Sequence, residues 1–404
     1  LDATGRVQAV LSGGAGKPVD TLARYHYTRT GLPQEAGRLT EWQSGRLVQH
    51  DDTHYQYDRA GRLIRKQVVQ PGYRPQVWQY RWDSRNQLRV VDTPNGERWL
   101  YRYDPFGRRV GKRCDQKAEE IRYQWDGDQI AEIRHYRHGQ LIQRRHWVYN
   151  GWELVVQQRQ HTGGDWETDF VTSSQNGTPQ ALFTPDGTLR WQAPTATLWG
   201  RRQAEKSESP DPGLAFAGQL RDSESGLCYN RFRYYDPAGG CYISPDPIGI
   251  AGGESNYAYA PNPITWIDPL GLAKCETLQY RHKIKPNKET NVRELRRQIR
   301  GQVRAFNQII KKEGMSGLKE RINNYSASLE KEGRDYVRKL GTAGEGKVWL
   351  HEPDMRAGGL PSDVTRTGLS RENSIIGGNA PSIARQILDM SDDVTRLTSK
   401  LFFD

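Results

Sequence analysis

The stretch Tyr-Gln-Tyr-Asp-Arg-Ala-Gly-Arg-Leu at residues 55–63 decides the fold predicted for the first two thirds of this chain. Its pattern is two aromatic residues around one other residue, an aspartate, a turn centred on Gly or Asn, and an apolar residue. The pattern returns at residues 80–88, 101–110 and 123–130, with a degenerate copy at 25–27. Residues alternate on both sides of each turn, which is typical of a β-hairpin. Because one hairpin cannot bury its face alone, we predict that successive hairpins stack into a continuous sheet.

The composition also favours strands over a helical globule in this region. Of the 404 residues, 35% are hydrophobic, whereas 12 are Trp and 20 are Tyr, which suits strands whose rings cover a sheet. No run approaches the roughly 18 apolar residues of a membrane span, and the first residues carry no signal peptide. The four cysteines form no CxxC pair and are too few for a disulfide framework, so we expect reduced thiols. The chain starts within the repeat pattern, and we expect it to be the C-terminal piece of a longer protein.

The repeats resemble the YD repeats of Rhs proteins. Stretches that look like the closing signature of the Rhs core lie at residues 176–180, 216–219, 226–237 and 242–249, the last of which reads Tyr-Ile-Ser-Pro-Asp-Pro-Ile-Gly. The resemblance implies an all-β shell of spiralled antiparallel hairpins that encloses a C-terminal toxin. We therefore expect a YD-repeat shell fragment over residues 1–235 and a signature and autocleavage segment over 236–272. Tyr and Trp are expected to pack the sheet, with carbohydrate binding by exposed rings as the alternative.

Two Asp-Pro-x-Gly turns end this region, at Asp246 and Asp268. Two carboxylates held close together can share a proton, so that one acts as an acid while the other activates a nucleophile. The alternative is that both aspartates cap Pro-Gly turns. The Rhs resemblance implies an intramolecular aspartyl-type protease in which Asp246 and Asp268 are catalytic and the cut falls between Leu272 and Ala273.

The chain departs from the Rhs pattern at one position of this expected protease. The family carries an arginine where Cys241 stands, just before the Ile-Ser-Pro-Asp stretch. If that arginine assists the cut, cleavage would be impaired here unless another residue replaces it, and Arg233 is the candidate substitute.

Residues 273–404 are expected to form a separate, mainly α-helical toxin domain. Residues 281–347 hold 18 basic and 8 acidic residues, which favours a polyanionic partner. Apolar spacings of three and four predict helices over 289–312 and 316–340. The first of these carries an arginine stripe formed by Arg293, Arg297, Arg300 and Arg304. The stripe predicts contact with nucleic-acid phosphates, with a solvated helix face as the alternative.

His351 and Asp354 are the candidate catalytic pair of this domain. Asp354 follows His351 three positions later, which is one turn if the segment is helical, so the imidazole and the carboxylate could bind a divalent metal together. Alternatively, the carboxylate could orient the imidazole as a general base. The surrounding sequence resembles the polymorphic toxin type 15 family, whose hallmark is this HxxD motif.

That resemblance implies a metal-dependent DNase, with Mg²⁺ as the expected ion, used against rival bacteria. His351 and Asp354 would be the catalytic and metal-binding residues. Three neighbours receive supporting roles: Asp363 as a second metal ligand, Arg371 as a phosphate clamp and Asn373 as a positioning group. The alternatives for these three are helix caps and loop hydrogen bonds.

The whole sequence is thus interpreted as an Rhs effector that carries a DNase, which self-cleavage after Leu272 releases. Such a protein would be made in the bacterial cytoplasm, exported by a contact-dependent or type VI secretion machine, and delivered into the cytoplasm of a target bacterium. Secretion components would bind an N-terminal region that this chain lacks. The shell and a cognate immunity protein, acidic where it meets residues 281–347, would protect the producer. The alternatives are a toxin acting on RNA or on a nucleotide such as NAD, and a non-enzymatic adhesin or scaffold.

Overall fold

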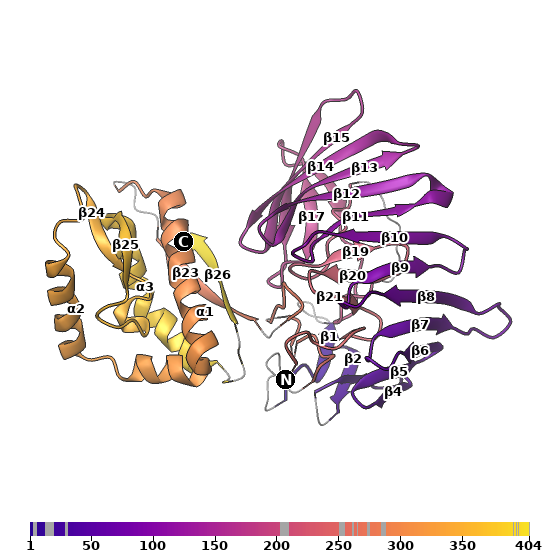
Figure 1. The fold of residues 1–404 in the computed structure, drawn as a ribbon, viewed down its shortest axis with the longest axis horizontal. Coiled ribbons are helices and arrows are strands. Elements are labelled where there is room, and N and C mark those ends of the chain that lie inside the picture. The colour runs from indigo at the N-terminus through magenta and orange to yellow at the C-terminus, as the bar shows by residue number, and fades with distance from the viewer. Residues whose placement is uncertain are drawn as a thin grey trace. The chain divides into compact units, whose positions relative to one another are not determined.

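The computed structural model describes residues 1–2, 6–12, 20–28, 31–202, 210–249, 255–260, 262–264, 266–272, 275–283, 288–390, 392, 394 and 396–403. The chain divides into two compact units, Leu1–Leu272 and Ala273–Asp404. Each unit is described here by itself (Figure 1).

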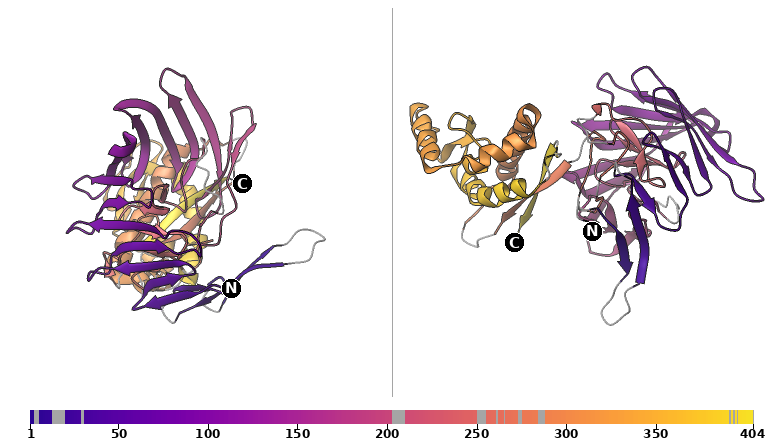
Figure 2. Two further views of the ribbon diagram at one scale, coloured as in Figure 1. Left: turned by 90° about the vertical axis from the view of Figure 1, so that its right-hand side faces the viewer. Right: turned by 90° about the horizontal axis from the view of Figure 1, so that it is seen from below.

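The first unit is dominated by an antiparallel sheet in which, over the residues described, 15 strands pair in chain order from β4 to β18. The strands are β4 (Thr40–Gln43), β5 (Arg46–His50), β6 (Thr53–Tyr57), β7 (Leu63–Val68), β8 (Gln76–Trp82), β9 (Leu88–Asp92), β10 (Arg98–Tyr103), β11 (Arg109–Cys114), β12 (Glu119–Asp126), β13 (Gln129–Arg137), β14 (Gln140–Asn150), β15 (Glu153–His161), β16 (Trp166–Ser173), β17 (Pro179–Phe183) and β18 (Leu189–Gln192). A short 3₁₀ turn, Asp115–Lys117, joins β11 to β12. Figure 2 shows successive strands side by side in a curved sheet. This 15-stranded sheet is called the wall. The prediction of a stacked hairpin sheet is therefore confirmed.

The repeat aspartates close the hairpin turns. Asp58 donates its backbone N–H to Arg62 O, and its Oδ1 accepts the N–H of Arg62 at 2.9 Å. Gly61 sits in this turn with φ 78°, and in the next repeat Asn86 takes the same place with φ 59°. Glycine and asparagine adopt this left-handed backbone at low cost, which explains why each repeat carries one of them there.

The first aromatic residue of each repeat builds the core of this unit. These rings are buried, with exposed fractions of 4% or less, and they belong to Tyr55, Tyr80, Tyr101 and Tyr123. A hydrophobic cluster joins three of them to side chains of the closing signature, among them Tyr229, Tyr234 and Ile243. The wall is thus packed by its own repeats on one side of the core and by the signature on the other.

The signature forms a second, smaller sheet of β19 (Leu220–Asp222), β20 (Leu227–Asn230), β21 (Arg233–Asp236) and β22 (Cys241–Tyr242), paired in that order. All residues of β20 to β22 are buried. A third sheet holds β1 (Ala9–Ser12), β2 (Asp20–Tyr27) and β3 (Pro33–Glu35).

A buried ion pair ties the small sheet to the wall. The Arg109 guanidinium, 0% exposed, contacts both carboxylate oxygens of Asp222, at 2.5 and 2.9 Å. Lys112 binds the same carboxylate at 2.9 Å and Glu224 at 2.7 Å. The ring of Tyr229 lies 4.3 Å from the guanidinium carbon, in a cation–π contact. Because buried charges must be paired, these contacts fix the position of the small sheet against β11.

The second unit mixes helices with strands. Its helices are α1 (Val292–Asn323), α2 (Ala327–Lys339) and α3 (Ser370–Asp389), and none of the described helices combines the length and apolarity needed to cross a membrane. Strand β23 (Cys275–His282) pairs in parallel with β26 (Arg396–Phe403), and β24 (Lys347–His351) pairs antiparallel with β25 (Val364–Leu369). A 3₁₀ turn, η3 (Met355–Ala357), follows β24.

The sequence missed these strands and misplaced one helix boundary. The helix predicted over 289–312 starts at Val292 and continues, through a kink where Gly314 has φ 75°, to Asn323. The predicted helix over 316–340 is therefore divided, and its second part begins at α2, where the Ser326 hydroxyl caps the N–H of Leu329 at 3.3 Å. The apolar spacing that predicted this helix marks its buried face, because Leu295, Ile299, Phe306 and Ile310 are buried.

Candidate functional site

Arg233 brings the two candidate protease aspartates together. Its Nη2 contacts Asp246 Oδ2 at 2.9 Å and Asp268 Oδ2 at 3.4 Å. All three side chains are at most 3% exposed. The two aspartates come from separate turns, and β21 supplies the arginine between them. The structure therefore places Arg233, the candidate substitute, inside this site.

The same residues hold the chain just before the expected cut. Asp268 Oδ1 accepts the N–H of Leu272 at 3.1 Å, and Arg233 donates its Nε–H to Gly271 O. Gly271 has φ 68°, and a Cβ there would lie 2.7 Å from Asn230 O, so only glycine fits. Leu272 thus lies at the aspartates, while Ala273, the other side of the predicted cut, falls outside the residues described.

The environments of the two aspartates differ. Burial raises the pKa of Asp246 from 3.8 to about 6, against the lowering effects of the Arg233 charge and the Ile248 N–H. Asp268 instead accepts a hydrogen bond from the Tyr242 hydroxyl at 2.8 Å. A carboxyl of raised pKa beside a second, hydrogen-bonded carboxylate is an arrangement suited to acid–base chemistry.

Cys241 lies on the other side of β22, away from this pair of aspartates. Burial raises the pKa of its thiol well above 9, and the nearby Asp236 carboxylate adds to the effect. Asp236 is already bound by the Tyr55 hydroxyl at 2.9 Å and by Lys66 at 3.3 Å. The departure from the family pattern therefore falls beside Asp236 and leaves Arg233 in place at the candidate site.

The HxxD segment is not helical. His351 ends strand β24, and Asp354 caps η3, with its Oδ1 accepting the N–H of Arg356 at 2.9 Å. Pro353 stands between them and has no N–H to donate, so a continuous helix is disfavoured. The two residues therefore do not lie one helical turn apart, yet the loop still brings both to one cavity.

A buried glutamine of α1 holds this loop. Gln302, 2% exposed, donates its side-chain amide to His351 O at 2.8 Å and accepts the N–H of Asp354 at 2.6 Å. One side chain thus ties both ends of the motif to the core of the unit. Sequence reasoning missed Gln302 because it stands about 50 residues before the motif and forms part of no pattern.

His351 and Asp354 line one cavity of about 520 Å³. Its other lining residues are Glu330, Arg334, Val337, Arg338, Trp349, Met355, Arg356, Asn373 and Gly377. Asn373 is thus the one supporting residue that the structure brings to the pair.

Asp363 and Arg371 do not line this cavity. The Asp363 carboxylate lies 3.6 Å from Arg321 and accepts the N–H of Leu360, while Arg371 donates to Lys288 O at 2.9 Å. Both residues therefore make the loop contacts that were their alternative reading.

The hydrogen bonds of the motif determine what it can do chemically. His351 Nε2 lies 3.3 Å from Pro361 O, and a carbonyl can only accept, so this contact requires the proton on Nε2 and leaves the Nδ1 lone pair available. Burial raises the pKa of Asp354, while the Arg356 N–H and the Arg356 and His351 side chains lower it. Among the residues described, no three His, Cys, Asp or Glu side chains gather as a metal site.

The predicted arginine stripe does not reach the cavity. Arg293, Arg300 and Arg304 are exposed on the side of α1 opposite its core, whereas Arg297 forms an ion pair with Glu294 at 2.6 Å. The arginines that do line the cavity belong to α2 and η3. They were not singled out from the sequence, although a spacing of four along the second helix is a visible signal.

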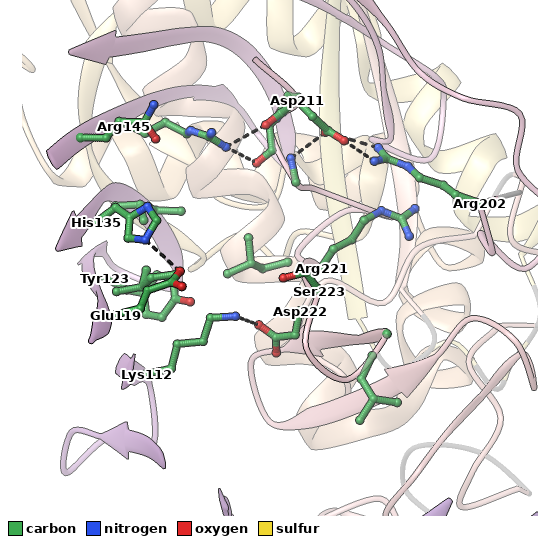
Figure 3. A pocket seen from close by; sticks show the side chains of 18 residues that line it. Lys112, Glu119, Tyr123, His135, Arg145, Arg202, Asp211, Arg221, Asp222 and Ser223 are labelled. Carbon is green, nitrogen blue, oxygen red and sulfur yellow. Dashed lines mark hydrogen bonds and ion pairs between the residues drawn. The ribbon is translucent and has the colours of Figure 1, made fainter. Parts of the chain in front are cut away.

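A separate cavity of about 420 Å³ lies in the first unit (Figure 3). Ion pairs join Lys112 to Asp222 and Arg202 to Asp211, and His135 Nε2 lies 2.8 Å from Glu119 Oε1. Burial lowers the pKa of Arg145 to about 10, and its guanidinium donates to two backbone carbonyls at 2.8 and 2.9 Å. Because these charges are matched within the unit, the cavity is explained as a polar layer between the wall and residues 211–227.

Comparison with known proteins finds a family match within the first unit. A family model, the teneurin YD-shell, matches residues 43–252. "Probable deoxyribonuclease RhsA" of Dickeya dadantii (strain 3937) is 93% identical over 280 residues, which cover 69% of this chain and 20% of that protein. The chain therefore spans about a fifth of that relative's length, and about a third of the chain lies outside the match.

More distant relatives carry other names. "Double-stranded DNA deaminase toxin A" of Burkholderia cenocepacia (strain H111) is 30% identical over 57% of this chain and 18% of its own length. "tRNA3(Ser)-specific nuclease WapA" of Bacillus spizizenii is 29% identical over 48% of this chain and 8% of its own length. The matched region thus recurs in proteins named for different activities.

Proposed function

This chain belongs to the teneurin YD-shell family, and from that membership we propose that it is an Rhs-type antibacterial effector whose residues 273–404 are a nuclease toxin. The family assignment bears out the resemblance of the tyrosine repeats to YD repeats. One observation carries the nuclease proposal: His351, Asp354 and Asn373 line a single cavity. The name of the 93% identical relative, a probable deoxyribonuclease, supports DNA as the substrate.

Hydrolysis of a phosphodiester requires that an attacking water lose a proton while negative charge at phosphorus is stabilised. The free Nδ1 of His351 can take that proton, and the Asp354 carboxylate stabilises the imidazolium that forms. Alternatively, both side chains hold a divalent metal such as Mg²⁺, with water and substrate phosphates as its remaining ligands. A bound ion would supply Lewis-acid charge and a more acidic water. One Nδ1 lone pair cannot do both, so metal dependence separates the two roles.

A plasmid assay tests the proposal. The 404-residue chain, incubated with supercoiled plasmid and Mg²⁺, is expected to nick and linearise it, and EDTA to stop the reaction. His351→Ala and Asp354→Asn should both be inactive. His282→Gln is the matched control, because this second histidine of the unit binds Thr290 and does not line the cavity. An intact plasmid in Mg²⁺ would refute the DNase.

RNA is the second candidate substrate, favoured by the relative named as a tRNA nuclease. The same chain incubated with total RNA decides between them. Degradation of RNA with an intact plasmid would assign an RNase to the His351 cavity. The nuclease proposal would be contradicted if the chain degrades neither plasmid nor RNA and if wild type and His351→Ala kill cells equally well.

We also propose that the Asp246–Asp268 site cuts the chain after Leu272. Three features support this: one arginine holds both carboxylates, the pKa of Asp246 is about 6, and Leu272 N–H binds Asp268. On a gel, wild type should give two bands, and Asp246→Asn or Asp268→Asn a single full-length band. Cys241→Ser is the matched control and should cleave as wild type does. An uncut wild-type chain would contradict the proposal.

The remaining expectations concern partners and delivery. We propose that a cognate immunity protein binds the second unit, and that secretion-system components take part in delivery. The shell would enclose the toxin until delivery into the cytoplasm of a target bacterium. Co-expression with the neighbouring reading frame, followed by a growth assay of cells that carry wild type or His351→Ala, checks the immunity step. Growth arrest that no companion protein relieves would oppose it.

A further inference from the structure

Helix α2 faces the HxxD cavity along most of its length. Its lining residues are Glu330, Arg334, Val337 and Arg338, which stand at positions i, i+4, i+7 and i+8 and so share one helix face. Gly333 is the one buried residue of α2, and a Cβ there would meet Met355 Sδ at 2.3 Å. The helix therefore supplies little to the core of the unit and presents its side chains to the cavity instead.

Three arginines stand at the rim of this cavity with exposed side chains. Arg334, Arg338 and Arg356 are 59%, 78% and 50% exposed. Arg334 and Arg356 share the carboxylate of Glu330, at 3.1 and 3.8 Å, so that two guanidinium groups face one negative charge. Exposed ion pairs of this kind are weak, and an incoming phosphate can replace them with bidentate contacts.

Trp349 supplies a flat apolar surface to the same cavity. It belongs to β24, two residues before His351, and its indole Nε1–H donates to Gly341 O at 3.0 Å. This hydrogen bond fixes the edge of the ring, and the residue lines the cavity. A held aromatic ring beside arginines is the combination with which proteins bind unpaired bases.

The size of the cavity limits what it can accept. A volume of about 520 Å³ lies in the range of small-molecule sites, roughly 300–1,000 Å³, and suits one nucleotide rather than a duplex. A base inside a duplex has both faces covered by its neighbours and cannot lie on an indole. We propose that the cavity takes one unpaired nucleotide of the strand, with its phosphates on Arg334, Arg338 and Arg356 and its base on Trp349. This inference rests on the proposed nuclease function and names its substrate as single-stranded or locally opened nucleic acid.

Binding to a chain that cannot cut tests this directly. The 404-residue His351→Ala chain is titrated against a fluorescent 20-nucleotide single strand and against a hairpin duplex of the same sequence, over a range of salt. We expect at least about tenfold tighter binding of the single strand. Adding Trp349→Leu should weaken the binding of that strand by about 5- to 100-fold, and Trp349→Phe should restore most of it. Adding Arg338→Gln should lower the salt slope by about 0.7, the value for one phosphate contact on a single strand.

Arg300→Gln is the matched control, since it removes the same charge from the exposed face of α1, outside the cavity. Equal losses from Arg300→Gln and Arg338→Gln would overturn the inference, and so would equal binding of duplex and single strand or no binding at all. The nuclease proposal fails in a different way. A wild-type chain that binds the strand through Arg338 and Trp349 but never cuts it would sink the nuclease and keep the binding site.

Discussion

Replacing Asp246 by asparagine should change how the stability of the first unit depends on pH. Burial raises the pKa of this carboxyl from 3.8 to about 6 in the folded chain. A raised folded-state pKa means that the fold favours the protonated form. The resulting stabilisation is complete below pH 4 and is lost as the pH rises through 6. Asp246→Asn carries no titrating group there, so it loses none.

The size of the effect follows from the pKa. At about 1.4 kcal/mol per pKa unit, the change from 3.8 to about 6 corresponds to about 3 kcal/mol. Relative to wild type, the Asp246→Asn variant should therefore gain about 3 kcal/mol in unfolding free energy between pH 4 and pH 7. For a unit of this size, about 2–4 °C per kcal/mol makes this a relative shift of roughly 6–12 °C in melting temperature.

Tryptophan fluorescence can follow the melting of this unit alone, because every Trp except Trp349 lies in residues 1–272. Melting curves of both chains would be compared at half-unit steps from pH 4 to 7, with a gel at each step to show whether the chain is intact. Asp58→Asn is the control with the opposite sign, since hydrogen bonds and the Arg62 charge lower the pKa of Asp58. A difference between wild type and Asp246→Asn that stays constant across this range would refute the reasoning.

Three further substitutions test other contacts. Gln302→Met removes both hydrogen bonds that Gln302 makes to the HxxD loop and should lower the rate of plasmid cleavage about 100-fold. Gln302→Glu still accepts the Asp354 N–H, so its cleavage rate should lie between those of wild type and Gln302→Met. Equal rates for all three chains would show that Gln302 does not position the loop. Gly333→Ala places a methyl group against Met355 Sδ and should speed hydrogen exchange throughout α2, as measured by mass spectrometry. Unchanged exchange would show that the Met355 side chain moves aside. Arg109→Met leaves Asp222 short of its main partner and should cost about 3–5 kcal/mol in urea unfolding of the first unit; a loss below 1 kcal/mol would show that Lys112 suffices.

Local patterns made the shell predictable. Each hairpin is specified within about ten residues, by alternation on both sides of a turn that needs Gly or Asn at a positive φ. The pairing of Arg109 with Asp222 could not be read in the same way, because 113 residues separate them and neither stands in an unusual pattern. The same holds for β23 and β26, whose parallel pairing joins the two ends of the second unit.

The candidate sites show where sequence patterns stop being informative. The HxxD residues were proposed from their spacing and from a family resemblance, but the spacing suggested a helix that Pro353 prevents, and that proline was visible in the sequence. Arg233 was named as a substitute for a missing arginine, and the structure places it between the aspartates. Gln302 had no such signal, because its role exists only once α1 packs on the loop.

The order of the strands in the wall has a mechanical consequence. Over the residues described, strands β4 to β18 pair within this sheet in chain order, each with the strands before and after it. A force applied to the two ends of the wall would load the hydrogen bonds of one strand pair at a time, beginning with the outermost pair. Each hairpin of about 22 residues would release about 70 Å of extended chain. Low, regular steps in a force–extension trace would follow from this topology, with the buried Arg109–Asp222 pair as the point of greatest resistance.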